Sequence, residues 1–200
     1  MAAEKDLKMD ALKEIGNIGI ANAATALASL LARRIDMDVP EAVVIGFDEI
    51  VKRIGTPEEL VACVFLGIKG DAPGDILFVF NQDSTNKLLK LLTGAEATGY
   101  ELDDFSASAL KEICNILAGS FAQAIGSLTG LQLLAEVPFF SYDMLAATLS
   151  TGLIASGAID DQVLVIDTNL IEQGEKITGH FFFVPKPGSL QKIFQALGIS

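Results

Sequence analysis

A glutamate followed three residues later by an asparagine occurs twice in this sequence, as Glu14 with Asn17 and as Glu112 with Asn115. Residues three positions apart lie on one face of a helix, so each pair would present a carboxylate beside an amide. Such a pair suits a surface that a partner can approach closely. Small residues extend the predicted surface beyond the two pairs: Ala21, Ala24, Ala118 and Ala122. One isolated pair would more often be an inconsequential polar pair, and the repetition is what favours a function.

The two pairs belong to a longer internal repeat. The first copy reads DALKEIGN from Asp10 and reaches Pro40 after 22 further residues. The second reads SALKEICN from Ser108 and reaches Pro138 after the same number, so both copies match at an offset of 98. A match held at one offset over some thirty residues is typical of an internal duplication. Whatever the Glu-x-x-Asn pair does, this protein is predicted to do it twice.

Familiar catalytic and cofactor motifs are absent from the sequence, which contains no P-loop, GxGxxG, HExxH or GxSxG pattern. The single histidine, His180, opens an apolar run without an acid, serine or cysteine partner at a recognisable spacing, which favours a structural role. The acidic pairs at 103–104 and 160–161 are typical of solvated turns. Cys63 and Cys114 lie in no CxxC motif and fit small buried side chains in a reducing cytosol. We therefore expect no metal and no cofactor in this chain.

Composition argues against two classes of partner. With 26 acidic and 14 basic residues the net charge is −12, and no basic cluster is present to bind nucleic acid or an anionic membrane. Residues 113–135 carry no charge and could span a bilayer by length. Polar residues interrupt them, however, and their first-copy counterpart contains Arg33 and Arg34, so we interpret them as a buried helix leading into a strand. The N-terminus lacks the apolar core of a signal peptide, which favours a cytoplasmic location.

Both halves of the chain predict the same order of elements: helix, strand, helix, strand, strand, helix. The first half predicts a helix at 10–31, a strand at 35–47, a helical turn at 48–54, strands at 60–68 and 76–80, and a helix through Leu92 that is closed by Gly94. The second half predicts a helix at 106–128, a strand through Pro138, a helix at 141–153, strands at 163–166 and 180–184, and a helix at 189–197. Asp10 is predicted to cap the first helix, and Asp83 or Ser84 the third. Pro40 predicts an edge position for its strand.

These elements predict an α+β fold with pseudo-twofold symmetry. Residues 1–200 are expected to form one domain from two repeats, at about 8–94 and 106–199. The glycine-rich connection at 70–74 predicts a hairpin and thus a mainly antiparallel sheet, against which the long helices pack. The offset between the halves grows to 105 near the C-terminus, which places about seven extra residues in the middle helix and loop of the second repeat.

The doubled pattern Asp/Ser-x₃-Glu-x₂-Asn-x₂₂-Pro resembles the CheC family of chemotaxis phosphatases, which is related to CheX and FliY. The runs EIGNIGIANAATAL, DDFSASALKEICNILAG and VPKPGSLQKIF are also similar to CheC, so the resemblance covers nearly all of the sequence. CheX-like members keep a single motif, and FliY-like members carry an added flagellar-switch domain without a counterpart in these 200 residues. The doubled motif therefore favours the two-site CheC pattern.

The resemblance implies hydrolysis of the aspartyl phosphate on a CheY-type response regulator. The regulator supplies both Mg²⁺ and the phosphorylated aspartate, so the phosphatase needs no nucleophile or cofactor of its own. By motif match, Asn17 and Asn115 position the attacking water, as a glutamine does in GTPases. Glu14 and Glu112 are expected to pair with a lysine of the regulator.

The remaining motif positions have expected structural roles. By the resemblance, Asp10 and Ser108 begin or cap the long helices, and Pro40 and Pro138 fix the start of the following strands. Cys114 stands where the first copy has Gly16 and is expected to add bulk beside the second site, so that the two sites differ in activity.

A second partner leaves an alternative function open. Members of this family are stimulated by the receptor deamidase CheD, and the helix at 141–153 is the candidate surface for it, with core packing as the competing interpretation. In the alternative function, the protein is a non-catalytic adaptor that binds CheD or the regulator. The rate of phosphate release from a phosphorylated regulator separates the two hypotheses.

Overall fold

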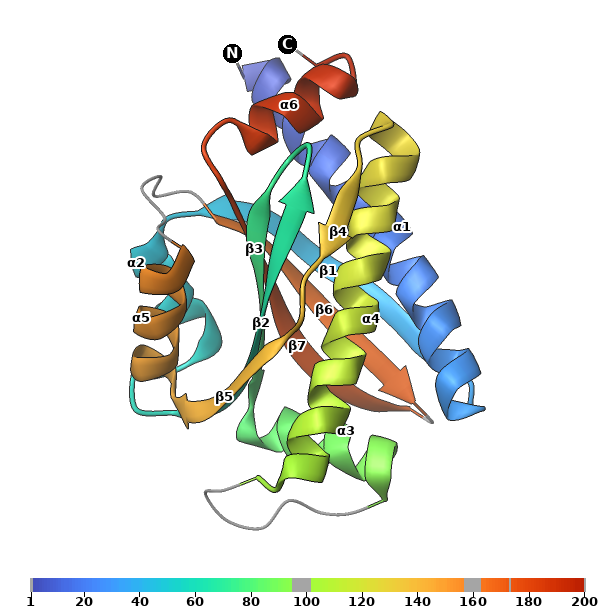
Figure 1. Ribbon diagram of the computed structural model, residues 1–200, viewed down its shortest axis with the longest axis vertical. Helices are drawn as coiled ribbons and strands as arrows, with labels where there is room; N and C mark the ends of the chain where they lie inside the picture. The colour runs from blue at the N-terminus through green and yellow to red at the C-terminus, as the bar shows by residue number, and fades with distance from the viewer. Residues whose placement is uncertain (1, 95–101, 157–162, 173, 200) are drawn as a thin grey trace.

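The computed structural model describes residues 2–94, 102–156, 163–172 and 174–199, which fold as alternating helices and strands (Figure 1). The elements of the first half are α1 (Ala2–Leu31), β1 (Asp36–Ile45), α2 (Phe47–Ile54), β2 (Leu60–Gly70), β3 (Gly74–Asn81) and α3 (Gln82–Thr93). Those of the second half are α4 (Asp104–Thr129), β4 (Leu133–Ala135), β5 (Phe139–Met144), α5 (Leu145–Ser156), β6 (Val163–Glu172), β7 (Glu175–Pro185) and α6 (Ser189–Ala196). The mixed fold with helices on an antiparallel sheet confirms the predicted α+β class.

The strands form one antiparallel sheet in the order β1-β6-β7-β3-β2-β4, with β5 also paired to β2. The hairpins β2–β3 and β6–β7 lie at its centre and are joined by the pairing of β3 with β7. The outer strands change sides, because β1 from the first half pairs with β6, and β4 and β5 from the second half pair with β2. Each half thus completes the sheet of the other.

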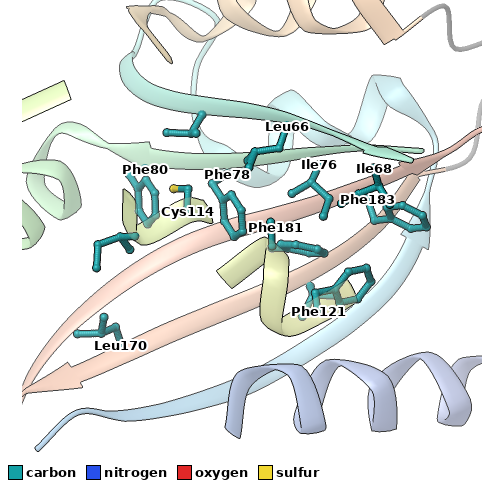
Figure 2. Packing of buried hydrophobic residues seen from close by; sticks show 14 of the residues in the cluster. Leu66, Ile68, Ile76, Phe78, Phe80, Cys114, Phe121, Leu170, Phe181 and Phe183 are labelled. Atoms are coloured by element: carbon teal, nitrogen blue, oxygen red, sulfur yellow. The ribbon is translucent and has the colours of Figure 1, made fainter. Parts of the chain in front are cut away.

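The two long helices cover one face of this sheet and run in opposite directions across it (Figure 1). Beneath them lies the larger core cluster, with four phenylalanine rings at its centre: Phe78, Phe121, Phe181 and Phe183 (Figure 2). The ring of Phe121 lies 4.7 Å from that of Phe181 and 5.5 Å from that of Phe183, centroid to centroid. This packing holds α4 on the sheet, and α1 packs into the same core through Leu12, Ile15 and Leu27.

A second core cluster lies on the opposite face, under α2 and α5. Ile50 of α2 and Leu145 of α5 pack there against strand residues that include Phe182. Side chains alternate between the faces of a strand, so the run of phenylalanines 181–183 contributes to both clusters. A central strand covered on both faces is continuously apolar, and this explains the absence of polar alternation in that part of the sequence.

Both predicted caps of the long helices are wrong. Helix α4 begins at Asp104 because the carboxylate of Asp103 accepts a hydrogen bond of 2.7 Å from the backbone N–H of Ser106, so Ser108 lies inside the helix. Helix α1 begins at Ala2, eight residues before Asp10. The residues between them are mostly strong helix formers, so nothing in that run stops the helix from extending towards the N-terminus.

The third helix also begins earlier than predicted. Asn81 caps α3 by accepting a hydrogen bond of 2.9 Å from the backbone N–H of Ser84, and Asp83 is already in the first turn. The helix ends at Gly94, as predicted, in a left-handed conformation with φ of 74° that glycine adopts without strain.

Two boundaries between strands and helices shift by a few residues. The strand predicted at 35–47 ends at Ile45, because Phe47 begins α2. The helix predicted at 141–153 begins only at Leu145, since residues 141–144 complete β5 against β2. Pro40 lies in the edge strand β1, where the register shifts between Asp38 and Glu41, in agreement with its predicted edge position.

Candidate functional site

Both Glu-x-x-Asn pairs lie exposed on the outer faces of the long helices. Glu14 and Asn17 project from α1, and Glu112 and Asn115 from α4. Within the described part of the chain, no hydrogen bond or ion pair holds any of these four side chains. The structure therefore has the predicted exposure, and all four groups are available to a partner.

An apolar residue between the glutamate and the asparagine of each pair fixes which face of its helix points outward. Ile15 of α1 and Ile113 of α4 lie immediately after the glutamates and are at most 2% exposed. Because an α-helix turns by about 100° per residue, burying these isoleucines directs Glu14 and Glu112 toward solvent. The heptad-like spacing of the buried residues is what positions the candidate site.

The two candidate sites lie on opposite sides of the point where the long helices cross. The helices cross where Gly19 of α1 meets Phe121 of α4. Asn17 precedes its crossing residue by two positions and Asn115 by six, so with antiparallel axes and a rise of 1.5 Å per residue the asparagines are separated by about 12 Å along the helices. Each pair thus occupies its own surface.

The predicted track of small residues is partly wrong. Ala118 and Ala122 of α4 are buried, at no more than 5% exposed, and face the core. The exposed residues that follow Asn115 are Gly119 and Gln123, whereas Ala21 is exposed on α1. A step of three to four residues turns a helix by 300–400°, so positions counted forward from the asparagine drift off its face. Much of the small-residue content serves packing against the core and between the helices.

The cysteine beside the second site does not change its surface. Cys114 is completely buried in the core cluster, whereas Asn115 is exposed. Burial raises the pKa of the Cys63 and Cys114 thiols well above the ordinary value, as expected for small buried side chains. A Cβ on Gly16 would lie 3.4 Å from Ile166, so this position faces the core in α1 as well. The prediction that Cys114 adds bulk beside Asn115 at the second site is therefore wrong.

The single histidine has an acidic partner, contrary to the prediction. His180 Nδ1 lies 2.8 Å from Asp167 Oδ1, because the two residues are directly opposite in the β6–β7 pair. Arg53 of α2 donates a hydrogen bond of 2.6 Å from Nη2 to Asp167 Oδ2. Burial by itself raises the pKa of Asp167, but the hydrogen bonds with His180 and Arg53 outweigh it and hold the pKa below the ordinary value. These residues connect α2 to the sheet on the face opposite the Glu-x-x-Asn pairs.

The remaining predictions concern metal ligands, the acidic pairs and a membrane span. Among the described residues, no group of three or more histidine, cysteine or acidic side chains could hold a metal ion. Asp103 of the first acidic pair is a helix cap, and residues 160–161 lie outside the described residues. None of the described helices is both long and apolar enough to cross a membrane.

Comparison with known proteins identifies the family. The CheC-like family matches residues 7–44, and the family described as chemotaxis phosphatase CheX matches residues 62–148. The chain is 39% identical over 201 residues to the CheY-P phosphatase CheC of Bacillus subtilis, covering 98% of this chain and 96% of that protein. The fold and the sequence together define a chemotaxis phosphatase of the CheC/CheX group. The chain belongs to the CheC family.

Flagellar switch proteins share the fold. The flagellar motor switch phosphatase FliY of Bacillus subtilis is 28% identical over 174 residues, which cover 86% of this chain and 44% of FliY. The crystal structure of Thermotoga maritima FliY superposes with a TM-score of 0.78 at 20% identity, covering 96% of both chains. A CheX crystal structure from Desulfovibrio desulfuricans gives a TM-score of 0.52 at 13% identity, covering 86% of this chain and 99% of that one. At these identities the two structures support the fold alone.

Proposed function

We propose that this protein hydrolyses the aspartyl phosphate of a CheY-type response regulator at two sites, Glu14–Asn17 and Glu112–Asn115. The observation that carries the proposal is that both pairs are exposed and without a partner in the described chain, in a protein of the CheC family. The Bacillus subtilis relative is named a CheY-P phosphatase. A cytoplasmic location accords with this substrate.

The reaction needs little from the phosphatase. A water oxygen attacks the phosphorus, the bond between the phosphorus and the aspartyl oxygen breaks, and the products are inorganic phosphate and a free carboxylate. Mg²⁺ held by the regulator neutralises the charge on the phosphoryl oxygens. The amide of Asn17 or Asn115 accepts a hydrogen bond from the water and holds it in line with the breaking bond, which lowers the entropic part of the barrier.

The glutamates fix the orientation of the complex. Glu14 and Glu112 lie one helical turn before the asparagines, so a lysine of the regulator bound to the carboxylate would hold the amide in register. The chain's net charge of −12 favours encounter with a basic face of the regulator. The glutamate thus acts in binding and the asparagine in the chemical step.

The adaptor function, in which CheD or the regulator binds without catalysis, remains the alternative. Helix α5, proposed as the CheD surface, places Leu145 and Leu149 in the second core cluster, while Ala146, Ala147 and Ser150 are exposed. One face of this helix is therefore required for packing, and CheD would have to bind the other. An adaptor would leave the rate of phosphate release unchanged.

Phosphate release from a phosphorylated regulator tests the proposal. The wild-type protein is expected to accelerate release, and the Asn17→Ala/Asn115→Ala double variant to abolish the acceleration with an unchanged circular dichroism spectrum. Removing a positioned group typically costs about 10²–10³ in rate, but the loss here is limited to the acceleration that the protein provides. Each single variant should keep the activity of the other site. A double variant with full activity would contradict the proposed role of the asparagines, and the adaptor function would then be favoured.

A further inference from the structure

Each long helix carries an exposed apolar side chain on the same side as its Glu-x-x-Asn pair. Leu7 of α1 is 52% exposed and Phe105 of α4 is 68% exposed. The two residues are 98 positions apart, so they are equivalent in the repeat, and each precedes its glutamate by seven residues. By contrast, seven other large apolar residues of the two helices are buried in the core: Leu12, Ile15, Leu27, Leu110, Ile113, Phe121 and Ile125.

Helical geometry places each apolar side chain in line with the site. Seven residues make two turns to within about 20°, so Phe105 lies almost directly below Glu112 at about 10 Å along the axis, and about 15 Å from Asn115. The same holds for Leu7 with Glu14 in the first repeat. Between them on this face lie only small or polar exposed positions, Asp10 in α1 and Ser108 in α4. Each helix therefore presents an apolar group, a carboxylate and an amide to one partner surface.

The start of α4 holds Phe105 in place. Asp103 caps the helix through the backbone N–H of Ser106, which fixes the backbone on both sides of Phe105. An exposed phenylalanine is then presented on an ordered first turn, and it brings a large contact area for little loss of side-chain freedom on binding.

We propose that Phe105 and Leu7 are apolar anchors that bind the response regulator beside each Glu-x-x-Asn pair, and that the larger Phe105 gives the second site the higher affinity. The inference rests on the proposed function and adds a residue that determines how tightly each site binds its substrate. The matching regulator surface carries an apolar patch next to the lysine that pairs with the glutamate. The two sites would then differ in KM for the regulator and share one chemical step.

The same helices provide a matched control. Leu30 of α1 and Leu128 of α4 are also equivalent in the repeat, and they are 54% and 39% exposed. They lie 23 residues beyond Leu7 and Phe105, which corresponds to about 35 Å along the axis and a rotation of about 140° away from the site face. If the effect came only from a lower surface hydrophobicity, substitution of Leu30 and Leu128 would have the same effect as substitution of Leu7 and Phe105.

Single-site backgrounds make the test specific. With Asn17→Ala, only the second site is active, and Phe105→Ala is expected to raise KM for the phosphorylated regulator about tenfold at an unchanged kcat, because a central apolar contact made equally in the bound complex and in the transition state is lost from both. With Asn115→Ala, only the first site is active, and Leu7→Ala should raise KM about threefold while Leu7→Phe lowers it. Leu30→Ala and Leu128→Ala should change neither constant.

Binding measured without turnover provides the second readout. Titration of each single-site variant with a regulator carrying beryllium fluoride as a stable phosphate mimic should give dissociation constants that shift as KM does. If phosphate is released but Phe105→Ala and Leu128→Ala have the same KM and dissociation constant, the anchor inference is wrong and the proposed function stands. If the wild-type protein releases no phosphate, the proposed function fails and this inference fails with it.

Discussion

Gly19 of α1 lies directly against the backbone of α4 at Phe121. A Cβ atom at Gly19 would be 3.2 Å from the Cα atom of Phe121 and 3.7 Å from the Cβ atom of Ala124. Because the nearest atom belongs to the backbone, it cannot move aside as a flexible side chain would. This close approach sets the spacing of the two helices that carry the Glu-x-x-Asn pairs.

Enlarging Gly19 should therefore destabilise the protein. Gly19→Val adds three carbon atoms at the crossing, and overpacking of this kind typically costs about 1–3 kcal/mol. Gly119→Ala is the matched control, because Gly119 is exposed and a Cβ there would meet nothing within 4 Å. That variant should gain up to about 1 kcal/mol from the higher helix propensity of alanine. Urea unfolding measures both, and equal stability of Gly19→Val and wild type would contradict a backbone contact at this crossing.

The link between α2 and the sheet should depend on pH. In the folded protein, burial raises the pKa of Asp167, but hydrogen bonds with His180 and Arg53 lower it further than burial raises it, so the net shift is downward. A depressed folded pKa contributes stability above the unfolded pKa, and this stability is lost as the pH falls through the folded value. Asp167→Asn should therefore cost about 1–3 kcal/mol at neutral pH, and the difference from wild type should shrink in acid.

Thermal unfolding from pH 7 down to about pH 3, below the ordinary aspartate pKa, measures this difference. Asp83→Asn is the control, because the Asp83–Lys87 ion pair is exposed on α3 and contributes little. A difference between Asp167→Asn and wild type that stays constant down to pH 3 would show that the charge of Asp167 does not contribute.

Local patterns in the sequence predict the parts of the site that lie within one helix. The offset of 98 residues identifies two equivalent Glu-x-x-Asn pairs, and helical spacing together with the apolar Ile15 and Ile113 predicts their exposure. The order of elements in the first half, the edge position of Pro40 and the closing Gly94 also follow from local rules. In the second half, the single strand predicted through Pro138 is wrong, because two strands, β4 and β5, lie on either side of that proline. That the two repeats together form one domain, with the predicted boundaries, stays a prediction.

Features that depend on distant segments could not be predicted in this way. The pairing of β1 with β6, and of β5 with β2, joins strands from opposite halves, and no local pattern specifies the partner of a strand. His180 and Asp167 meet only because of the β6–β7 register. The cap at Asp103 was missed for a different reason: several polar residues near the start of α4 can cap a helix, and the structure decides between them.

Metal dependence is predicted to reside in the regulator. Elemental analysis of the purified protein should find no stoichiometric metal, since the described residues contain no cluster of ligands. Phosphate release should nevertheless require Mg²⁺, and its Mg²⁺ dependence should follow that of the regulator's own dephosphorylation. A tightly bound metal that survives dialysis against a chelator would contradict this assignment.

The glutamates should act on binding rather than on the chemical step. In the Asn17→Ala background, Glu112→Gln keeps the size of the side chain but removes the charge that pairs with a lysine, so KM for the regulator should rise about threefold to tenfold. The KM of this variant should depend less on salt concentration than the KM of its Asn17→Ala parent, because the ion pair that salt screens is absent. Glu58→Gln is the matched control, since Glu58 is exposed in the loop before β2 and the substitution changes the net charge equally. Steady-state kinetics at two salt concentrations separates the cases: a fall in kcat at constant KM would place Glu112 in the transition state beside Asn115.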